Sequence, residues 1–164
     1  MIQDILPHRY DVSYHPERTP ERRSFLVLVS REGVLFAERD GAFTLPRFSD
    51  FETEALSFTS LCQKSRYLFA IDRDYFFLLP PSALPAGKLG EGYRFLGPTE
   101  LRDLKPQHLA FAAITSTQLY RFYDQRKFCG RCGEKMTHAE EERAMCCKHC
   151  GLIEYPKISP AVIV

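Results

Sequence analysis

The chain has 164 residues and a formal net charge of +1, so no strong electrostatic field points to nucleic acid or to an anionic membrane. Apolar residues make up 45% of the sequence, as in globular proteins, and no apolar run is long enough to span a bilayer. The 13 phenylalanines and 8 tyrosines, with no tryptophan, predict a core rich in phenylalanine. The first residues lack the basic-then-apolar form of a secretion signal, and reduced cysteines suit a cytosolic compartment. We therefore expect a cytoplasmic protein that has no membrane partner.

The N-terminal part of the sequence predicts strands. Residues 1–23 are polar and carry three prolines, which favours an extended arm with one short strand near residues 10–14. Apolar runs follow at 25–29, 34–37 and 43–45, and turn residues separate them. We expect these three runs to form an antiparallel meander.

The next segment predicts a second hairpin. Residues 51–61 fit either a short helix or a loop with a strand. The apolar runs 67–71 and 75–79 flank a short polar turn, which is the pattern of a hairpin. Residues 93–96 predict one further strand.

Helices are expected after the strands. A short helical region is predicted at 100–104. A longer helix is expected from Pro106, where a first-turn proline is tolerated, to about Lys127. Its apolar face is formed by residues at helical spacing: Leu109, Ala112, Ala113, Ser116, Leu119, Tyr120, Phe122 and Tyr123.

Two cysteine pairs follow this helix directly. Both have the spacing Cys-x-x-Cys-Gly: Cys129 with Cys132, and Cys147 with Cys150. Paired knuckles of this kind are typical of a zinc ribbon, in which four thiolates hold one tetrahedral ion. The glycine after each pair permits a positive φ, so that backbone N–H groups point at the sulfurs. Because four thiolates leave no open coordination position, we predict a structural zinc. Two disulfides, or thiols without metal, are the alternative.

The other cysteines are weaker candidates. Cys146 would leave a gap of three residues before Cys150, whereas Cys147 gives the knuckle spacing, so Cys147 is the expected ligand. Cys62 has no histidine nearby in the sequence and is interpreted as a buried thiol.

These elements predict an α+β fold with an N-terminal antiparallel-sheet domain, a connecting helix and a four-cysteine zinc ribbon. The expected boundaries are 1–105 for the domain, 106–127 for the helix and 128–155 for the ribbon. The last run, 161–164, has the composition of a buried strand without partners. We therefore expect residues 156–164 to begin a further domain that is truncated here.

The ribbon and its flanks resemble the NADH pyrophosphatase branch of the Nudix hydrolases, or NAD⁺ diphosphatases. The resemblance is carried by Phe122-Tyr123, Lys127-Phe128-Cys129-Gly130-Arg131-Cys132-Gly133, Ala144-Met145, Cys147, His149-Cys150, Tyr155-Pro156 and Ser159-Pro160-Ala161-Val162-Ile163. It implies that the chain is the N-terminal and ribbon portion of such an enzyme, and that residues 156–164 open its Nudix domain.

The resemblance also implies an activity for the whole protein. The family hydrolyses the pyrophosphate of NAD(H) to nicotinamide mononucleotide and AMP, and some members remove NAD caps from RNA. The reaction uses Mg²⁺ or Mn²⁺ held by glutamates of the Nudix box. That box is absent from these 164 residues, so the chain alone is expected to be inactive. A homodimer is implied as well.

Four residues match substrate-contacting positions of the family. Tyr155 matches a tyrosine that contacts the nucleotide, and Glu142 matches a ribbon glutamate that contacts substrate. Arg47 stands where the family often has a substrate-contacting lysine, and Arg102 matches the arginine of a Leu-Arg pair. The alternative for each is an ordinary core or surface residue.

A different class of protein is also possible on this sequence, namely a zinc ribbon that binds nucleic acid or another protein. Basic residues of the ribbon, such as Arg131 and Lys148, are compatible with a nucleic-acid backbone. They alternate with acids, including Glu140 and Glu141, which a phosphate-binding surface normally excludes.

Overall fold

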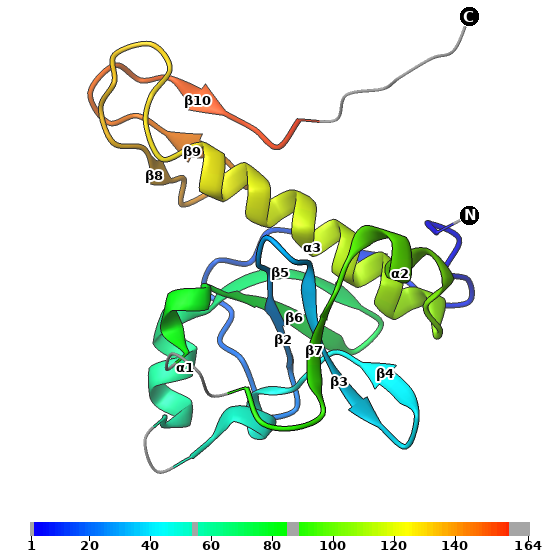
Figure 1. Ribbon diagram of the computed structural model, residues 1–164. Coiled ribbons are helices and arrows are strands. Elements are labelled where there is room, and N and C mark those ends of the chain that lie inside the picture. The colour runs from blue at the N-terminus through cyan, green and yellow to red at the C-terminus, as the bar shows by residue number, and fades with distance from the viewer. Residues whose placement is uncertain (1, 54–55, 85–88, 158–164) are drawn as a thin grey trace, which may run out of the picture. The chain divides into compact units, whose positions relative to one another are not determined.

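The computed structural model divides the chain into two compact units, Met1–Thr117 and Gln118–Val164 (Figure 1). It describes residues 2–53, 56–84 and 89–157, so the expected strand at 161–164 lies outside the described residues. The strands are β1 (Tyr10–Asp11), β2 (Phe25–Leu28), β3 (Val34–Arg39), β4 (Ala42–Thr44), β5 (Arg66–Ile71), β6 (Asp74–Leu79), β7 (Tyr93–Leu96), β8 (Thr137–His138), β9 (Met145–Cys146) and β10 (Ile153–Glu154). The helices are η1 (Phe48–Phe51), α1 (Phe58–Lys64), η2 (Pro81–Ala83), α2 (Pro98–Asp103) and α3 (Gln107–Gln125).

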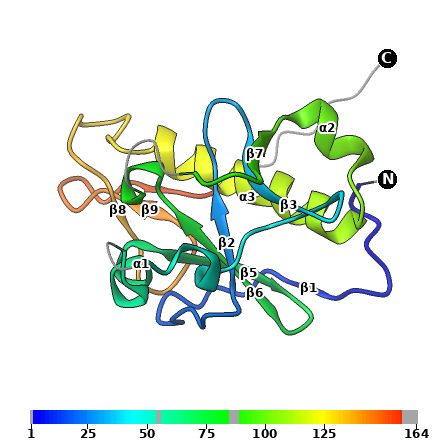
Figure 2. The ribbon, with the colours of Figure 1, turned by 60° about the horizontal axis from the view of Figure 1, so that its bottom comes forward.

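A four-stranded sheet in the order β1-β5-β6-β2 is the centre of the first unit. The predicted hairpin is confirmed, since β5 pairs with β6 in antiparallel register. The short N-terminal strand β1 adds to β5, with Tyr10 opposite Ile71 and Asp11 opposite Ala70. Figure 2 shows the N-terminal segment running alongside this hairpin. The sheet therefore joins the first residues of the chain to a turn more than sixty positions later.

A three-stranded sheet in the order β4-β3-β7 forms the rest of this unit's β structure. Strands β3 and β4 are antiparallel neighbours, as expected for the runs 34–37 and 43–45, and β7 pairs with the other edge of β3. All strands described in this sheet are antiparallel to their neighbours.

The expected three-stranded meander is wrong in one respect, because β2 does not form a ladder with β3. It pairs in parallel with β6, and a single bridge between Val29 and Val34 connects it to β3. All four residues of β2 are buried, without the alternation of a strand that has one wet face. A run of this kind is covered by packing on both faces of the sheet, which is usual for strands with a parallel neighbour.

The core is rich in phenylalanine, as the composition predicts. Phe36, Phe48, Phe69, Phe76 and Phe77 are among its largest fully buried side chains. Their rings pack as stacked and edge-to-face pairs; Phe69 and Phe76 stack at 5.0 Å, and Phe48 meets Phe77 edge-on at 5.8 Å. Such pairs stabilise a core beyond the area they bury.

The second unit contains the end of α3 and a three-stranded antiparallel sheet in the order β10-β9-β8. This sheet and a cluster of four cysteines make the unit a zinc ribbon, and the expected α+β fold class is confirmed. Among the described helices, none has both the length and the apolar character that crossing a membrane requires.

Gly33 gives a direct test of this packing, because its backbone passes very close to β7. A Cβ atom at this position would lie 2.0 Å from the carbonyl oxygen of Leu96, and the φ angle of +144° is rare for other residues. We expect Gly33→Ala to lower the free energy of unfolding by at least about 2 kcal/mol in a denaturant titration. Gly90→Ala is the matched control, since nothing lies within 4 Å of its added Cβ. Equal stabilities of the two variants would contradict the described approach of Gly33 to β7.

Candidate metal centre and substrate-contacting residues

The two cysteine knuckles have the same backbone geometry. In the first, the Gly133 N–H donates to the Cys129 carbonyl at 2.9 Å, and the Cys129 N–H donates to the Glu134 carbonyl at 2.7 Å. In the second, Gly151 and Cys147 make the equivalent bonds, both at 2.9 Å. The glycine φ angles are 79° and 74°, as the sequence predicts. Each Cys-x-x-Cys-Gly segment is thus a tight turn that places two sulfurs on one side.

The two turns bring four sulfurs together. The Sγ atoms of Cys129, Cys132, Cys147 and Cys150 all lie within 4.8 Å of one another. The shortest separations join the two knuckles, at 3.5 Å from Cys129 to Cys150 and 3.4 Å from Cys132 to Cys147. A disulfide requires about 2.05 Å, whereas a tetrahedron of thiolates around zinc has edges of about 3.8 Å. The cluster fits a four-thiolate zinc site.

The electrostatics of the cluster favour a bound cation. Burial raises the pKa of the Cys129 thiol, but hydrogen bonds from the backbone N–H groups of Cys132 and Arg131 and from neighbouring thiols lower it to about 6. The Glu134 N–H lowers the pKa of Cys132, but burial and the thiols of Cys147 and Cys150 raise it to about 12. Cys129 is therefore stabilised as a thiolate, whereas Cys132 is stabilised as a thiol. A dication allows all four to be deprotonated together.

Only a small apolar core supports this centre. Its buried members are Phe122, Met136 and Met145 with the sulfurs of Cys129 and Cys147, and the partly buried Tyr123, Cys150 and Leu152 pack against them. The Arg126 guanidinium donates to the Glu154 carboxylate, which joins the end of α3 to β10. So few apolar groups cannot offset the entropy of ordering the chain, so the metal is expected to be a condition of folding for this unit.

Cys146 lies outside the cluster. It belongs to β9, and its Sγ atom is 3.4 Å from the hydroxyl of Thr137. Of the two adjacent cysteines, the structure therefore brings Cys147 to the other sulfurs, which agrees with the choice made from the spacing. Cys62 is half-buried, and burial raises the pKa of its thiol, so it is not prepared to act as a nucleophile.

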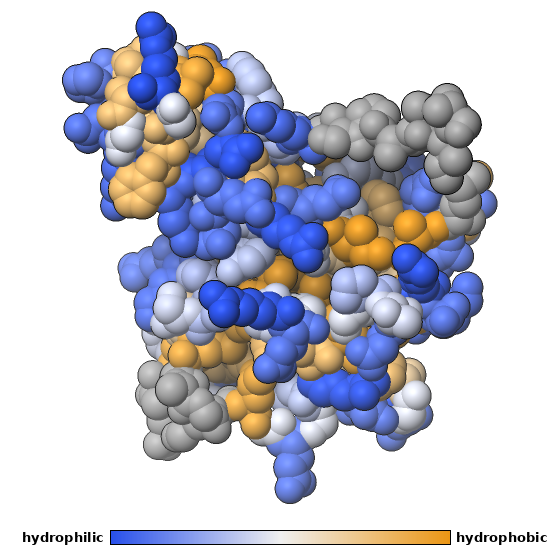
Figure 3. All heavy atoms as spheres, turned by 45° about the horizontal axis from the view of Figure 1, so that its top comes forward, coloured by the Kyte–Doolittle hydropathy of each residue, from blue (hydrophilic) through white to orange (hydrophobic). Residues whose placement is uncertain are grey.

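Tyr155 and Glu142 are hydrogen-bonded to each other, which the sequence did not predict. The Tyr155 hydroxyl donates to Glu142 Oε1 at 2.8 Å, and this bond raises the pKa of the phenol. The tyrosine is 50% exposed, although its ring is large and apolar. Phe128 and Ile153 of the same unit are exposed too, and Figure 3 shows hydrophobic atoms open to solvent on the ribbon, at the upper left. The pair therefore presents a ring whose hydroxyl edge is fixed by a carboxylate.

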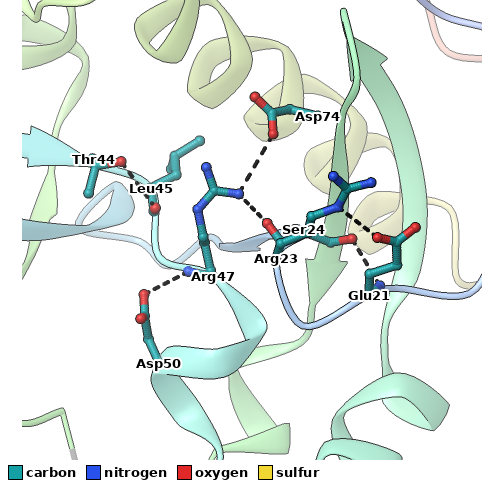
Figure 4. A network of polar contacts seen from close by, with 8 residues as sticks. All are labelled: Glu21, Arg23, Ser24, Thr44, Leu45, Arg47, Asp50 and Asp74. Atoms are coloured by element: carbon teal, nitrogen blue, oxygen red, sulfur yellow. Dashed lines mark hydrogen bonds and ion pairs between the residues drawn. The ribbon is translucent and has the colours of Figure 1, made fainter.

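Arg47 is engaged inside the first unit. Its guanidinium donates to the carbonyl of Arg23 and forms an ion pair with Asp74 at 3.6 Å (Figure 4). It also lies over the ring of Phe25 at 4.1 Å. Its backbone N–H donates to Asp50 at 2.8 Å. A ligand would have to compete with these contacts. Arg102 is exposed in the last turn of α2.

Comparison with known proteins identifies the ribbon. Residues 124–155 match the model of the NADH pyrophosphatase zinc ribbon domain. The NAD-capped RNA hydrolase NudC of Deinococcus radiodurans is 37% identical over 86 residues, which is 52% of this chain and 31% of that protein. The proteins of the same description from Pseudomonas fluorescens and Klebsiella pneumoniae are 45% identical over 49 residues and 49% identical over 47 residues. Each of these two matches covers 18% of the relative, so the chain spans only a minor part of the curated proteins it resembles.

The two adjacent cysteines offer a matched test of the metal centre. We expect the purified chain to retain one zinc ion per molecule after dialysis, measured by inductively coupled plasma mass spectrometry. Cys147→Ser should lose most of this metal, because it removes one of the four clustered sulfurs. Cys146→Ser removes a sulfur that contacts Thr137 and should keep the full metal content. Loss of zinc in both variants, or in neither, would contradict the proposed ligand set.

Proposed function

We propose that this chain is the N-terminal and ribbon portion of a Nudix hydrolase that cleaves the pyrophosphate of NAD(H), because residues 124–155 match the NADH pyrophosphatase zinc ribbon domain. The products would be nicotinamide mononucleotide and AMP. The observation that carries this proposal is the ribbon match, together with four sulfurs spaced for a structural zinc. The relatives' described activity extends the proposed substrates to NAD-capped RNA.

The chain's own part in this reaction is binding and support. Its 164 residues contain no Nudix box, whose glutamates would hold the Mg²⁺ or Mn²⁺ that polarises the phosphates. The proposed catalytic groups therefore belong to a Nudix domain of the same enzyme. We propose that the ribbon supports that domain and contributes to the substrate site, in a cytoplasmic homodimer.

Tyr155 is the proposed contact for a base or nicotinamide ring. Its half-exposed ring can stack on a flat heterocycle, and such stacking contributes about 1–3 kcal/mol. Glu142 holds the phenol edge at 2.8 Å, so the ring has fewer orientations to lose when a ligand stacks on it. In this view Glu142 positions the tyrosine and also offers its second oxygen to a hydroxyl of the substrate.

Arg102 and Arg47 are proposed as phosphate contacts, and the structure favours Arg102 over Arg47 for this role. Arg102 is exposed and sits where its guanidinium can meet an anion from solvent. Arg47 would first have to leave Asp74 and the carbonyl of Arg23. We therefore expect Arg102 to contribute more than Arg47 to any phosphate contact made by this part of the enzyme.

An exchange of ribbons tests the proposal. Residues 124–157 of this chain would replace the matching segment of the D. radiodurans relative, and hydrolysis of NADH and of NAD-capped RNA would be measured with Mg²⁺ and with Mn²⁺. We expect the exchanged enzyme to keep its activity. Tyr155→Ala in it should lower kcat/KM by about tenfold or more, because the stacking surface is lost. Tyr155→Phe keeps the ring and should cost on the order of fivefold or less.

The control is the zinc content of each exchanged protein, which must stay at one ion per ribbon. This chain alone, assayed under the same conditions, is expected to show no turnover. An exchanged enzyme that holds zinc but does not act on either substrate would exclude the proposed function. Equal binding of RNA with and without the NAD cap, weakened by salt, would instead favour the alternative of a nucleic-acid-binding ribbon.

A further inference from the structure

We propose that the N-terminal unit carries a second binding site, in which Arg9 and Arg73 hold the phosphate of a nucleotide. The two arginines line one surface pocket of about 720 Å³ together with Tyr10, Asp11, Val12 and Asp72. This volume is in the range of small-molecule sites. The inference is independent of the proposed pyrophosphatase function, because it uses no residue of the ribbon.

The sheet register brings the two arginines to the same end of a strand pair. Strand β1 runs antiparallel to β5, and the pairing continues past Tyr10 to Arg9 and Asp72. The Asp72 N–H donates to the Arg9 carbonyl at 2.9 Å, and the Arg9 N–H donates to Asp72 Oδ1 at 2.8 Å. Arg73 is the next residue, in the turn between β5 and β6. Two hydrogen bonds therefore hold Arg9 to Asp72, and Arg73 follows Asp72 directly in the chain.

The acids of the pocket already have internal partners. Asp72 Oδ1 accepts the Arg9 N–H, and its Oδ2 is hydrogen-bonded to His8 Nδ1 at 2.7 Å. Asp11 accepts the Ser13 N–H at 2.9 Å. The bonds to Asp72 hold the pKa of its carboxyl group below the usual range, and the Ser13 hydroxyl, followed by the Ser13 N–H, does the same for Asp11. In contrast, the guanidinium groups of Arg9 and Arg73 have no ion-pair or hydrogen-bond partner among the residues that the structure describes.

The base of the pocket is held in place by aromatic rings. Tyr10 packs edge-on against Phe69 at 5.3 Å and Phe111 at 5.0 Å. The rings of His8 and His108 lie 4.1 Å apart, and burial, followed by the charge of His8, lowers the pKa of His108. The lowered pKa favours the neutral form of His108. A wall that is already ordered loses little entropy when a ligand binds.

The composition of the pocket indicates the class of ligand. Guanidinium groups match phosphate oxygens in bidentate geometry. Val12 is 57% exposed and Tyr10 is 37% exposed, so the same pocket offers an apolar wall beside the two cations. A phosphate attached to a flat heterocycle, as in a mononucleotide, satisfies both features. The two aspartates cancel the formal charge of the arginines, so binding depends on hydrogen bonds more than on a long-range field.

NMR titration of the zinc-loaded chain tests this site. AMP is the probe; adenosine lacks the phosphate, and a short single-stranded RNA carries nucleotides in a chain. We expect AMP to shift the amide signals of residues 9–12 and 72–73, and adenosine to leave them in place. The double variant Arg9→Gln/Arg73→Gln should weaken AMP binding at these signals by tenfold or more. Arg31→Gln removes another exposed arginine, outside the pocket, and should bind AMP within twofold of the unchanged chain.

The RNA arm identifies the source of the nucleotide. If RNA binds more tightly than AMP and its affinity depends more steeply on salt, the ligand of the site is an RNA strand. If AMP binds more tightly than RNA, the ligand is a free nucleotide. The site is excluded if neither probe shifts the pocket signals, or if the double variant binds as the unchanged chain does. Shifts confined to Tyr155 and its neighbours would also exclude it, and would leave the proposed function of the ribbon standing.

Discussion

Mutual repulsion of four thiolates is the constraint on which the ribbon depends. The four sulfurs lie within 4.8 Å of one another, where deprotonating one raises the cost of deprotonating the next. A bound dication offsets the repulsion, because it attracts each of the four thiolates. The local sequence prepares the site, since each glycine with a positive φ closes a turn, and in the first turn the Arg131 N–H donates to the Cys129 sulfur. The apolar core of Phe122, Met136 and Met145 then needs to contribute only part of the stability.

The geometry of the candidate substrate contact, Tyr155 with Glu142, depends on this metal centre. Tyr155 follows the second knuckle by a few residues, and Glu142 lies in the span between the knuckles. Without a fixed ribbon, nothing would hold the phenol 2.8 Å from the carboxylate. The zinc takes no part in the proposed chemical step. It would nevertheless determine whether the Tyr155 ring is held in the position that binds a ligand. The closed coordination of four cysteines gives the zinc a structural role, so the proposed catalytic cations would have to be held by other residues.

Features set by local chemistry were predictable from the sequence, and features set by distant pairing were not. The spacing of Cys129 and Cys132 fixes a knuckle within five residues, and the turn at Asp72 fixes a hairpin. The apolar run of β2 fits a parallel or an antiparallel partner equally well. Its parallel pairing with β6 could therefore not be predicted without knowing how all strands of the sheet are arranged. The bond between Tyr155 and Glu142 depends on how the ribbon's strands align. The pocket beside Arg9 likewise depends on the register of β1 against β5.

Hydrogen exchange, followed by mass spectrometry with and without a zinc chelator, tests most directly whether the metal builds the ribbon. Exchange would be read from peptides covering residues 128–154 and from peptides covering β5 and β6. If the metal centre organises the ribbon, removing zinc should abolish protection in residues 128–154 and leave the β5–β6 hairpin protected. The opposite result, a ribbon that stays protected after all zinc has been removed, would show that its fold rests on something other than the four thiolates.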